Sequence, residues 1–226
     1  MQELFHIPDY PLRIECFDVS HTAANETVAA MTVFINGEKK KSLYRRYIVK
    51  KSIGDDYSAL RETLLRRYRA TKKNDDIPDL IIIDGGKAHL DTAMKALSAT
   101  ASPKTAIIAI AKEKGRHDKG LSQEQIFLPK KREPMLLPLH SPTLFMLQNI
   151  RDETHRYVIS YHRKRRAKAS LHSKLKNIPG IGPVKQKRLL QHFGSVQKIK
   201  NASEKDLRNV KGINSANVNV LRRTLQ

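Results

Sequence analysis

Apolar residues in the first half of the chain fall into short runs, and the spacing within each run predicts a strand or a helix. β-Branched and aromatic residues are frequent in three early runs, over 13–19, 27–35 and 41–49, which predict three strands. Asn36-Gly37 stands between the second and third runs, and this dipeptide is a strong signal for a tight hairpin. We therefore predict consecutive antiparallel strands.

Helical spacing begins after these strands. In residues 58–70 the apolar side chains recur every three or four positions, which predicts one buried face of a helix. Asp55 and Asp56 precede this segment and are suited to cap its start. The later runs predict a strand over 80–84, a helix over 87–97 and a strand over 105–111.

This order of elements is that of the RNase H-type fold, an α/β fold with a mixed sheet flanked by helices. In that fold the first and fourth strands lie side by side and carry acidic residues. Residues 112–134 are polar, and we predict an irregular loop there. Residues 141–160 predict a further helix, with Ser141 as its N-cap and Pro142 at its first position.

Positive charge is concentrated in the last third of the chain. The formal charge is +21; residues 161–226 hold 17 Lys and Arg against 2 Asp and Glu, whereas residues 1–160 hold 26 against 20. Such a block indicates a nucleic-acid partner, and Gly-Pro turns interrupt any long amphipathic helix that could lie on a membrane. Trp is absent, which argues against base stacking on single strands and favours duplex. We predict a domain over 1–160, a basic linker over 161–172 and an all-α DNA-binding domain over 173–226.

Cysteine usage and hydropathy bear on the compartment. Cys16 is the one cysteine, so the sequence offers neither a disulfide framework nor a zinc finger. No segment resembles a transmembrane span or a secretory signal. We expect a cytoplasmic protein without a membrane partner.

Two predicted strands each end in an aspartate, Asp18 and Asp84, and Gly85-Gly86 follows the second. A carboxylate at the end of a buried strand is costly unless a cation offsets its charge, so the pair predicts a shared divalent ion. Such an ion activates water and neutralises the leaving oxygen in phosphodiester cleavage. The alternative is that each aspartate only caps the turn that follows it.

The residues alone leave two further candidates open. Asp55 and Asp56 precede a helix, so either a metal role for one of them or a capping role for both fits. His155 lies one turn from Arg151 on the predicted late helix, and an imidazole can be a metal ligand or a general base near neutrality. The alternative for this segment is an exposed helix of alternating charge.

The segment Ile178-Pro-Gly-Ile-Gly-Pro183 is typical of a helix-hairpin-helix motif that binds a backbone phosphate through glycine-bordered N–H groups. A second copy, Val210-Lys-Gly-Ile-Asn-Ser215, has Asn214 in place of Gly182, and because Asn tolerates positive φ we expect its turn to survive. Ordinary helix-turn-helix packing is the alternative for both. The predicted DNA contacts are Gly180, Gly182, Lys185, Lys187, Gly212, Asn214, Arg163, Lys164, Arg165 and Arg166.

Seven motifs, in order from about Arg13 to the chain end, resemble the C-terminal half of UvrC, the incision subunit of the bacterial UvrABC nucleotide excision repair system. They are Cys16-Phe-Asp-Val-Ser-His21, Arg45-Arg-Tyr47, Gly54-Asp-Asp-Tyr57, Ile77-Pro-Asp79, Ile83-Asp-Gly-Gly-Lys87, Arg151-Asp-Glu-Thr-His155 and His162-Arg-Lys-Arg-Arg-Ala-Lys168.

The resemblance implies an RNase H-like endonuclease domain that makes the 5′ incision beside a lesion, followed by a tandem helix-hairpin-helix domain that binds DNA. It implies that Asp18, Asp84 and His155 are catalytic and hold Mg²⁺ or Mn²⁺, and that Asp56 is also functional. The implied partners are lesion-bearing double-stranded DNA and UvrB, with UvrA in the full system. Family members begin with a GIY-YIG nuclease domain and a UvrB-binding segment; because neither is present, we expect the chain to be a fragment.

Two other functions stay open on the sequence. A non-catalytic DNA-binding module on an RNase H scaffold would have a degenerate site, and intact Asp18, Asp84 and His155 argue against it. An RNase H-fold endonuclease acting on deaminated bases or RNA–DNA hybrids is compatible with these residues, although the tandem hairpins favour duplex DNA.

Overall fold

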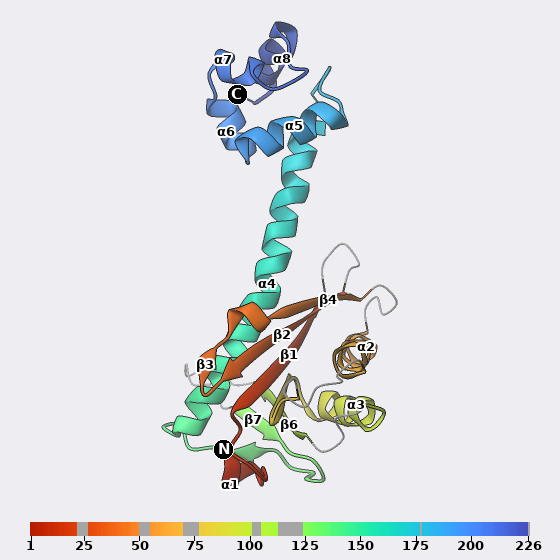
Figure 1. Cartoon of the computed structure of the whole chain (residues 1–226), viewed down its shortest axis with the longest axis vertical. Coiled ribbons are helices and arrows are strands. Elements are labelled where there is room, and N and C mark those ends of the chain that lie inside the picture. Colours follow the sequence, from red (N-terminus) through yellow and green to blue (C-terminus); the bar gives the residue numbers. More distant parts are fainter. Residues whose placement is uncertain are drawn as a thin grey trace. The chain divides into compact units, whose positions relative to one another are not determined.

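The computed structural model describes most of the chain as two compact units. The described residues are 1–21, 27–49, 55–69, 77–100, 105–112, 124–176 and 178–225, without the side chains of 162–174 and 176. The first unit, Met1–Ser160, is called the sheet unit here, and the second, Tyr161–Gln226, the helical unit (Figure 1). Gly54 of the predicted Gly-Asp-Asp-Tyr motif lies outside the described residues.

A mixed sheet forms the centre of the sheet unit. Within the described residues it has eight strands, in the order β3-β2-β1-β5-β6-β7-β8, with β4 paired to β2. β5 runs parallel to both β1 and β6, and the other pairs are antiparallel. The strands are β1 (Arg13–His21), β2 (Thr27–Ile35), β3 (Glu38–Lys39), β4 (Arg45–Val49), β5 (Leu80–Asp84), β6 (Ala106–Lys112), β7 (Glu124–Phe127) and β8 (Met135–Leu136).

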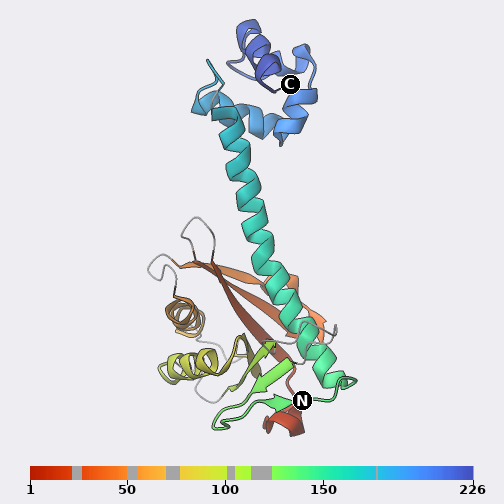
Figure 2. The ribbon, with the colours of Figure 1, turned by 180° about the vertical axis from the view of Figure 1, so that it is seen from behind.

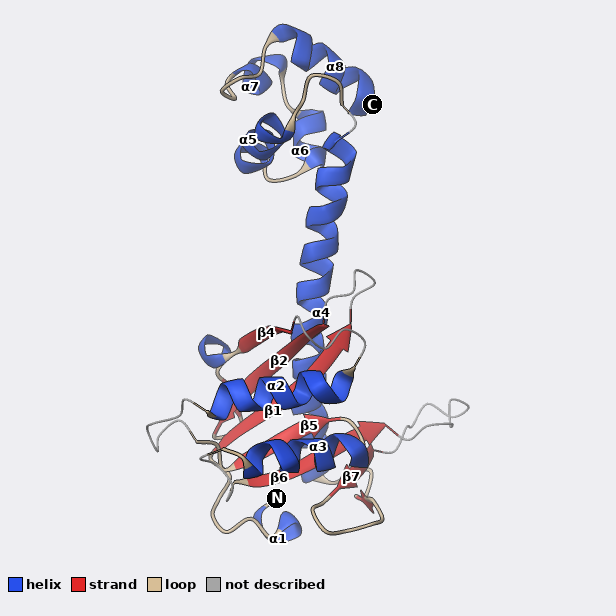
Figure 3. Ribbon diagram, turned by 90° about the vertical axis from the view of Figure 1, so that its right-hand side faces the viewer, coloured by secondary structure: helices blue, strands red, loops and turns tan. Residues whose placement is uncertain are grey.

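Helices cover both faces of this sheet. Figure 3 shows two of them across one face, and Figure 2 shows a third on the opposite face. The first pair is α2 (Asp56–Tyr68) and α3 (Lys87–Ser98); the third is α4 (Pro142–Lys176), and a short α1 (Gln2–Phe5) lies near the N-terminus.

The two faces have separate apolar cores because successive strand residues point to opposite sides. Phe17, Ile81 and Ile83 pack with side chains of α2 and α3. Cys16 and Ile82 belong to the other core, which includes Leu144, Leu147 and Ile150 of α4. The predicted fold class, a mixed RNase H-like sheet flanked by helices, is confirmed.

Two expectations for the sheet unit were wrong in part. The hairpin turn forms at Asn36-Gly37, both with positive φ, but the strand paired across it is the short β3, which the sequence did not predict. The predicted third strand, 41–49, begins instead with a 3₁₀ turn at Lys41–Leu43, and its strand part, β4, starts only at Arg45. Residues 112–134 are not irregular throughout, since β7 pairs with β6. β7 has only four residues, too few for an alternating pattern to be recognised in the sequence. Residues 113–123 lie outside the described part.

The helical unit contains short helices joined by tight turns. They are α5 (Pro183–Phe193), α6 (Val196–Asn201), α7 (Glu204–Arg208) and α8 (Ser215–Leu225). Leu175, Ile178, Leu189, Leu207 and Leu221 are buried together in its core. Residues 161–172, predicted as a basic linker, are helical and belong to α4. Among the described residues, none of the helices is sufficiently long and apolar to cross a bilayer.

Candidate metal centre and nucleic-acid interface

Asp18 and Asp84 lie at the adjoining ends of two parallel strands. The register pairs Phe17 of β1 with Ile83 of β5, so an aspartate comes next on each strand. Because strand side chains alternate, both aspartates share the face of Cys16 and Ile82, which α4 covers. Asp18 is only 7% exposed, so its charge is removed from most solvent.

His155 joins the two aspartates from α4. Its Nδ1 lies 3.0 Å from Oδ2 of Asp18. The preceding residue, Thr154, is fully buried, and its hydroxyl lies 2.5 Å from the hydroxyl of Thr32 on β2. This buried contact joins α4 to β2 one residue before His155.

Asp18, Asp84 and His155 form a triad that could hold a metal ion. One ligand atom from each residue can be chosen so that all three lie within 4.8 Å of one another, and this is the group found among the described residues. Two carboxylate oxygens and an imidazole nitrogen suit a divalent cation of the Mg²⁺ or Mn²⁺ class, and the residues therefore fit the ion that the sequence predicted.

The electrostatics of the triad favour a bound cation. Burial, followed by the neighbouring Asp18 carboxylate, raises the pKa of Asp84 to about 7, although Arg151 and His155 oppose the shift. The hydrogen bond to Asp18 is the main cause of a raised pKa at His155. Two close carboxylates, one of them hard to ionise, gain most from a ligand that brings positive charge.

A buried ion pair lies behind the triad. Arg151 of α4 and Glu124 of β7 are 5% and 1% exposed, and their side chains form a salt bridge. Arg151 also donates to Oδ1 of Asp152 at 2.6 Å. The sequence did not indicate Glu124 because the four-residue strand that carries it was predicted as loop; the apolar residues Ile126 and Phe127 were the local signal.

Asp56 does not enter the triad. Its carboxylate pairs with Nε2 of His21 at the end of β1, and Nδ1 of His21 lies 2.9 Å from the Thr27 hydroxyl. Asp55 is the N-cap of α2 and accepts from the Tyr57 N–H at 3.0 Å. The two neighbouring aspartates thus have different surroundings: Asp55 caps the helix, and Asp56 faces the strand that carries Asp18.

In the helical unit, two glycines adopt the backbone that the hairpins require. Gly180 and Gly212 have φ of +77° and +91°, a region that L-residues with side chains rarely occupy. The two hairpin regions are linked by side chains: Lys185 donates to the Gly180 carbonyl at 3.0 Å and to Oδ1 of Asn217 at 2.8 Å. Arg188 donates to the carbonyl of Lys211 at 2.9 Å.

The second turn survives, as expected, but not through positive φ at Asn214. Neither Asn214 nor Gly182 has positive φ. Oδ1 of Asn214 instead accepts a hydrogen bond from the Asn217 N–H at 2.9 Å. Asn214 is therefore the N-cap of α8.

Lys185 and Lys187 differ although both were predicted DNA contacts. Lys185 is engaged within the unit, whereas Lys187 is exposed. The other predicted contacts lie in α4, where the structure describes their backbone but not their side chains: Arg163, Lys164, Arg165 and Arg166.

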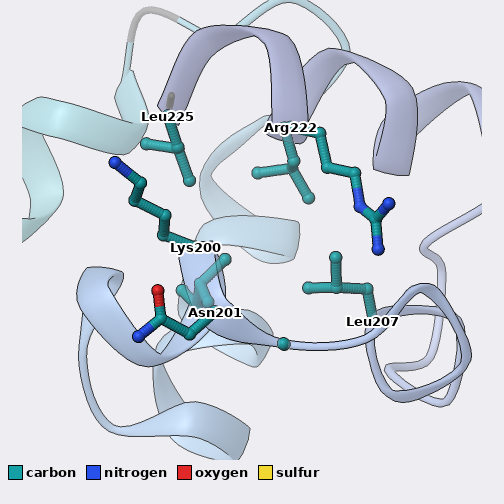
Figure 4. A pocket seen from close by; sticks show the side chains of 8 residues that line it. Lys200, Asn201, Leu207, Arg222 and Leu225 are labelled. Atoms are coloured by element: carbon teal, nitrogen blue, oxygen red, sulfur yellow. The ribbon is translucent and has the colours of Figure 1, made fainter.

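A cavity of about 300 Å³ lies elsewhere in the helical unit (Figure 4). Three of its lining residues, Ile199, Leu207 and Leu221, belong to the core of the unit. None of the predicted DNA contacts lines it. Its residues are Ile199, Lys200, Asn201, Ala202, Leu207, Leu221, Arg222 and Leu225.

The sheet order, the acidic strand ends and the paired hairpins define an RNase H-like domain followed by a tandem helix-hairpin-helix domain. Residues 2–159 match the family model described as the UvrC RNase H endonuclease domain, and residues 173–226 match the SAM-like helix-hairpin-helix tandem. The chain therefore belongs to the UvrC family, which confirms the resemblance found in the sequence.

Curated relatives give the same family. The chain is 49% identical over 227 residues to the UvrABC system protein C of Protochlamydia amoebophila, which covers 100% of the chain and 37% of that relative. It is 44% identical over 218 residues to the protein of the same name from Methylobacillus flagellatus, and this match covers 96% of the chain and 36% of that relative. The chain thus spans about a third of the length of these relatives.

Among solved structures, the chain is similar to that of human ENDOV. The superposition covers 69% of this chain and 86% of that one, with 12% sequence identity and a TM-score of 0.40.

Proposed function

We propose that the chain is a divalent-metal-dependent DNA endonuclease that makes the 5′ incision of bacterial nucleotide excision repair. The observation that carries the proposal is the triad of Asp18, Asp84 and His155, whose ligand atoms lie within 4.8 Å of one another at adjoining strand ends. The name of the curated relatives, UvrABC system protein C, supports the repair context.

In this proposal Asp18 and Asp84 hold Mg²⁺ or Mn²⁺ through carboxylate oxygens. The ion would supply an activated water and neutralise charge on the phosphate oxygens. Oδ2 of the Asp18 carboxylate also accepts a hydrogen bond from Nδ1–H of His155, which fixes the orientation of the imidazole ring. The side chain of His155 is 56% exposed, and its raised pKa suits it to take a proton from the attacking water.

Asp56 has a supporting role in the proposal. Its ion pair with His21 holds the end of β1, three residues beyond Asp18, against the start of α2. The pair therefore positions the strand end that carries the metal ligand.

The helical unit holds the DNA duplex. Its 17 basic residues against 2 acidic ones supply attraction to phosphates, and the hairpins at Gly180 and Gly212 supply backbone N–H groups. Lys187, which is exposed, is a candidate phosphate contact, whereas Lys185 stabilises the first hairpin. We propose lesion-bearing duplex as the substrate, delivered with UvrB and, in the full system, UvrA.

Calorimetric titration with Mn²⁺ tests the metal site. The wild type should bind the ion, and Asp84→Asn should lose most of that binding because one of the two carboxylates is gone. Asp152→Asn, an exposed carboxylate on α4, is the matched control and should bind as the wild type does. Equal binding by the wild type and Asp84→Asn would refute the assigned site.

A further inference from the structure

Tyr57 and His89 form an aromatic pair beside the candidate metal centre. Their ring centroids lie 4.7 Å apart, and the rings are tilted by 42°. Tyr57 stands in the first turn of α2 and His89 in the first turns of α3, so two separate helices bring the rings together. Tyr57 is 45% exposed, so much of its surface is open to solvent although its ring contacts His89.

The position of His89 is tied to the strand that carries Asp84. A Cβ built on Gly85, the residue after Asp84, would lie 2.5 Å from Cγ of His89. The imidazole therefore occupies the space that any side chain at position 85 would need. Gly85 has φ of +151°, so this close approach uses both properties of glycine, its missing side chain and its backbone freedom.

Tyr57 is likewise tied to the end of β1. It follows Asp56, whose carboxylate pairs with His21. The aromatic pair thus belongs to the α2 and α3 side of the site, and His155 approaches from α4 on the other face of the sheet. The strand ends that carry Asp18 and Asp84 thus have the aromatic pair on the α2 and α3 side and the imidazole of His155 on the α4 side.

We propose that Tyr57, backed by His89, stacks one nucleobase that has left the duplex next to the cleaved phosphate. The inference rests on the proposed nuclease function and deepens it, since it names the form of DNA that the site accepts. Every base offers a flat π surface, so stacking on Tyr57 would be independent of sequence. An exposed tyrosine on a protein surface is ordinary by itself. Here the ring contacts His89, and the His89 imidazole lies against the backbone of Gly85, the residue after Asp84, so Tyr57 is held near the strand end that carries this candidate ligand.

We call Tyr57 and His89 the stacking platform. Its role is tested by measuring the affinity of the protein for nicked duplexes in EDTA, where no cleavage takes place. A single abasic residue is moved through the positions around the nick, and affinity is measured by fluorescence anisotropy. At one position the wild type should lose about 5- to 150-fold in affinity, the range expected when one base–aromatic stack is removed. Tyr57→Phe should retain that loss, and Tyr57→Leu should bind the intact and abasic duplexes alike. Tyr10→Leu removes an exposed tyrosine outside the site and should behave as the wild type.

Two results would overturn the platform: equal wild-type affinity for every abasic duplex, or a position-specific loss that persists in Tyr57→Leu. Cleavage is assayed separately with Mn²⁺. Cleavage without a position-specific loss would reject the platform and leave the nuclease assignment intact. A position-specific loss that requires Tyr57, in a protein that does not cleave with Mn²⁺, would support the platform and reject the nuclease assignment.

Discussion

Lowering the pH from 8 to 6 should weaken binding of Mn²⁺ to the candidate metal centre about tenfold. Burial and the Asp18 carboxylate raise the pKa of Asp84 to about 7. With that pKa, the carboxyl group is roughly 90% protonated at pH 6 and roughly 10% protonated at pH 8. A metal ion must displace this proton before the carboxylate can bind, so the apparent dissociation constant rises as the pH falls. The pKa of His155 is also raised, and protonation of its ring opposes the metal in the same direction.

Calorimetry at both pH values measures the effect, and a second buffer with a different ionisation enthalpy counts the protons released. Roughly 0.9 proton should leave Asp84 for each ion bound at pH 6, and roughly 0.1 at pH 8. His155→Gln separates the two groups: it keeps Asp84, so a rise of the dissociation constant on acidification should remain. Equal dissociation constants at pH 6 and pH 8, with no proton release, would show that the two aspartates do not share the ion as proposed.

Two further predictions concern the scaffold around the sites. Gly180→Ala should destabilise the helical unit by about 1–2 kcal/mol and weaken duplex binding, because φ of +77° is unfavourable for Ala and the new Cβ would lie 3.1 Å from Nδ2 of Asn217. Gly182→Ala, with nothing within 4 Å of its Cβ and φ of −71°, is the control; equal denaturation midpoints for the two variants would contradict the assigned turn. Thr154→Val should cost about 1–3 kcal/mol of unfolding free energy in urea, because it leaves the buried Thr32 hydroxyl without this partner, whereas Thr32→Val with Thr154→Val should recover most of the loss. An additive double variant would refute the coupling.

The acidic pair was predictable because strand ends can be read from local pattern. Asp18 and Asp84 each follow an apolar run, and two parallel neighbours bring such ends to one edge of the sheet. His155 was different: its segment alone favoured an exposed helix, and only the family resemblance singled it out. Its approach to Asp18 requires α4 to pack on the sheet, as it does at the buried contact of Thr154 with Thr32, and these elements lie far apart in the chain.

Features that depend on packing between elements could not be predicted from the sequence. Glu124 lies on a strand of four residues, and its buried partner Arg151 comes from α4. The Tyr57–His89 contact requires α2 and α3 to lie side by side, which neither helical pattern specifies. Asn214 was assigned to the hairpin for its backbone tolerance, but its side chain caps α8, and both uses of Asn fit the same sequence.

The three triad residues come from β1, β5 and α4, and Asp18 and His155 are 137 positions apart. A chain emerging from the ribosome would therefore expose both aspartates long before α4 is available to complete the site. If the centre binds an ion only when all three residues are in place, the ion would stabilise the folded sheet unit and not its partly folded forms. On the proposed function, a partly synthesised chain would not cut DNA, because the triad is complete only after α4 has packed on the sheet.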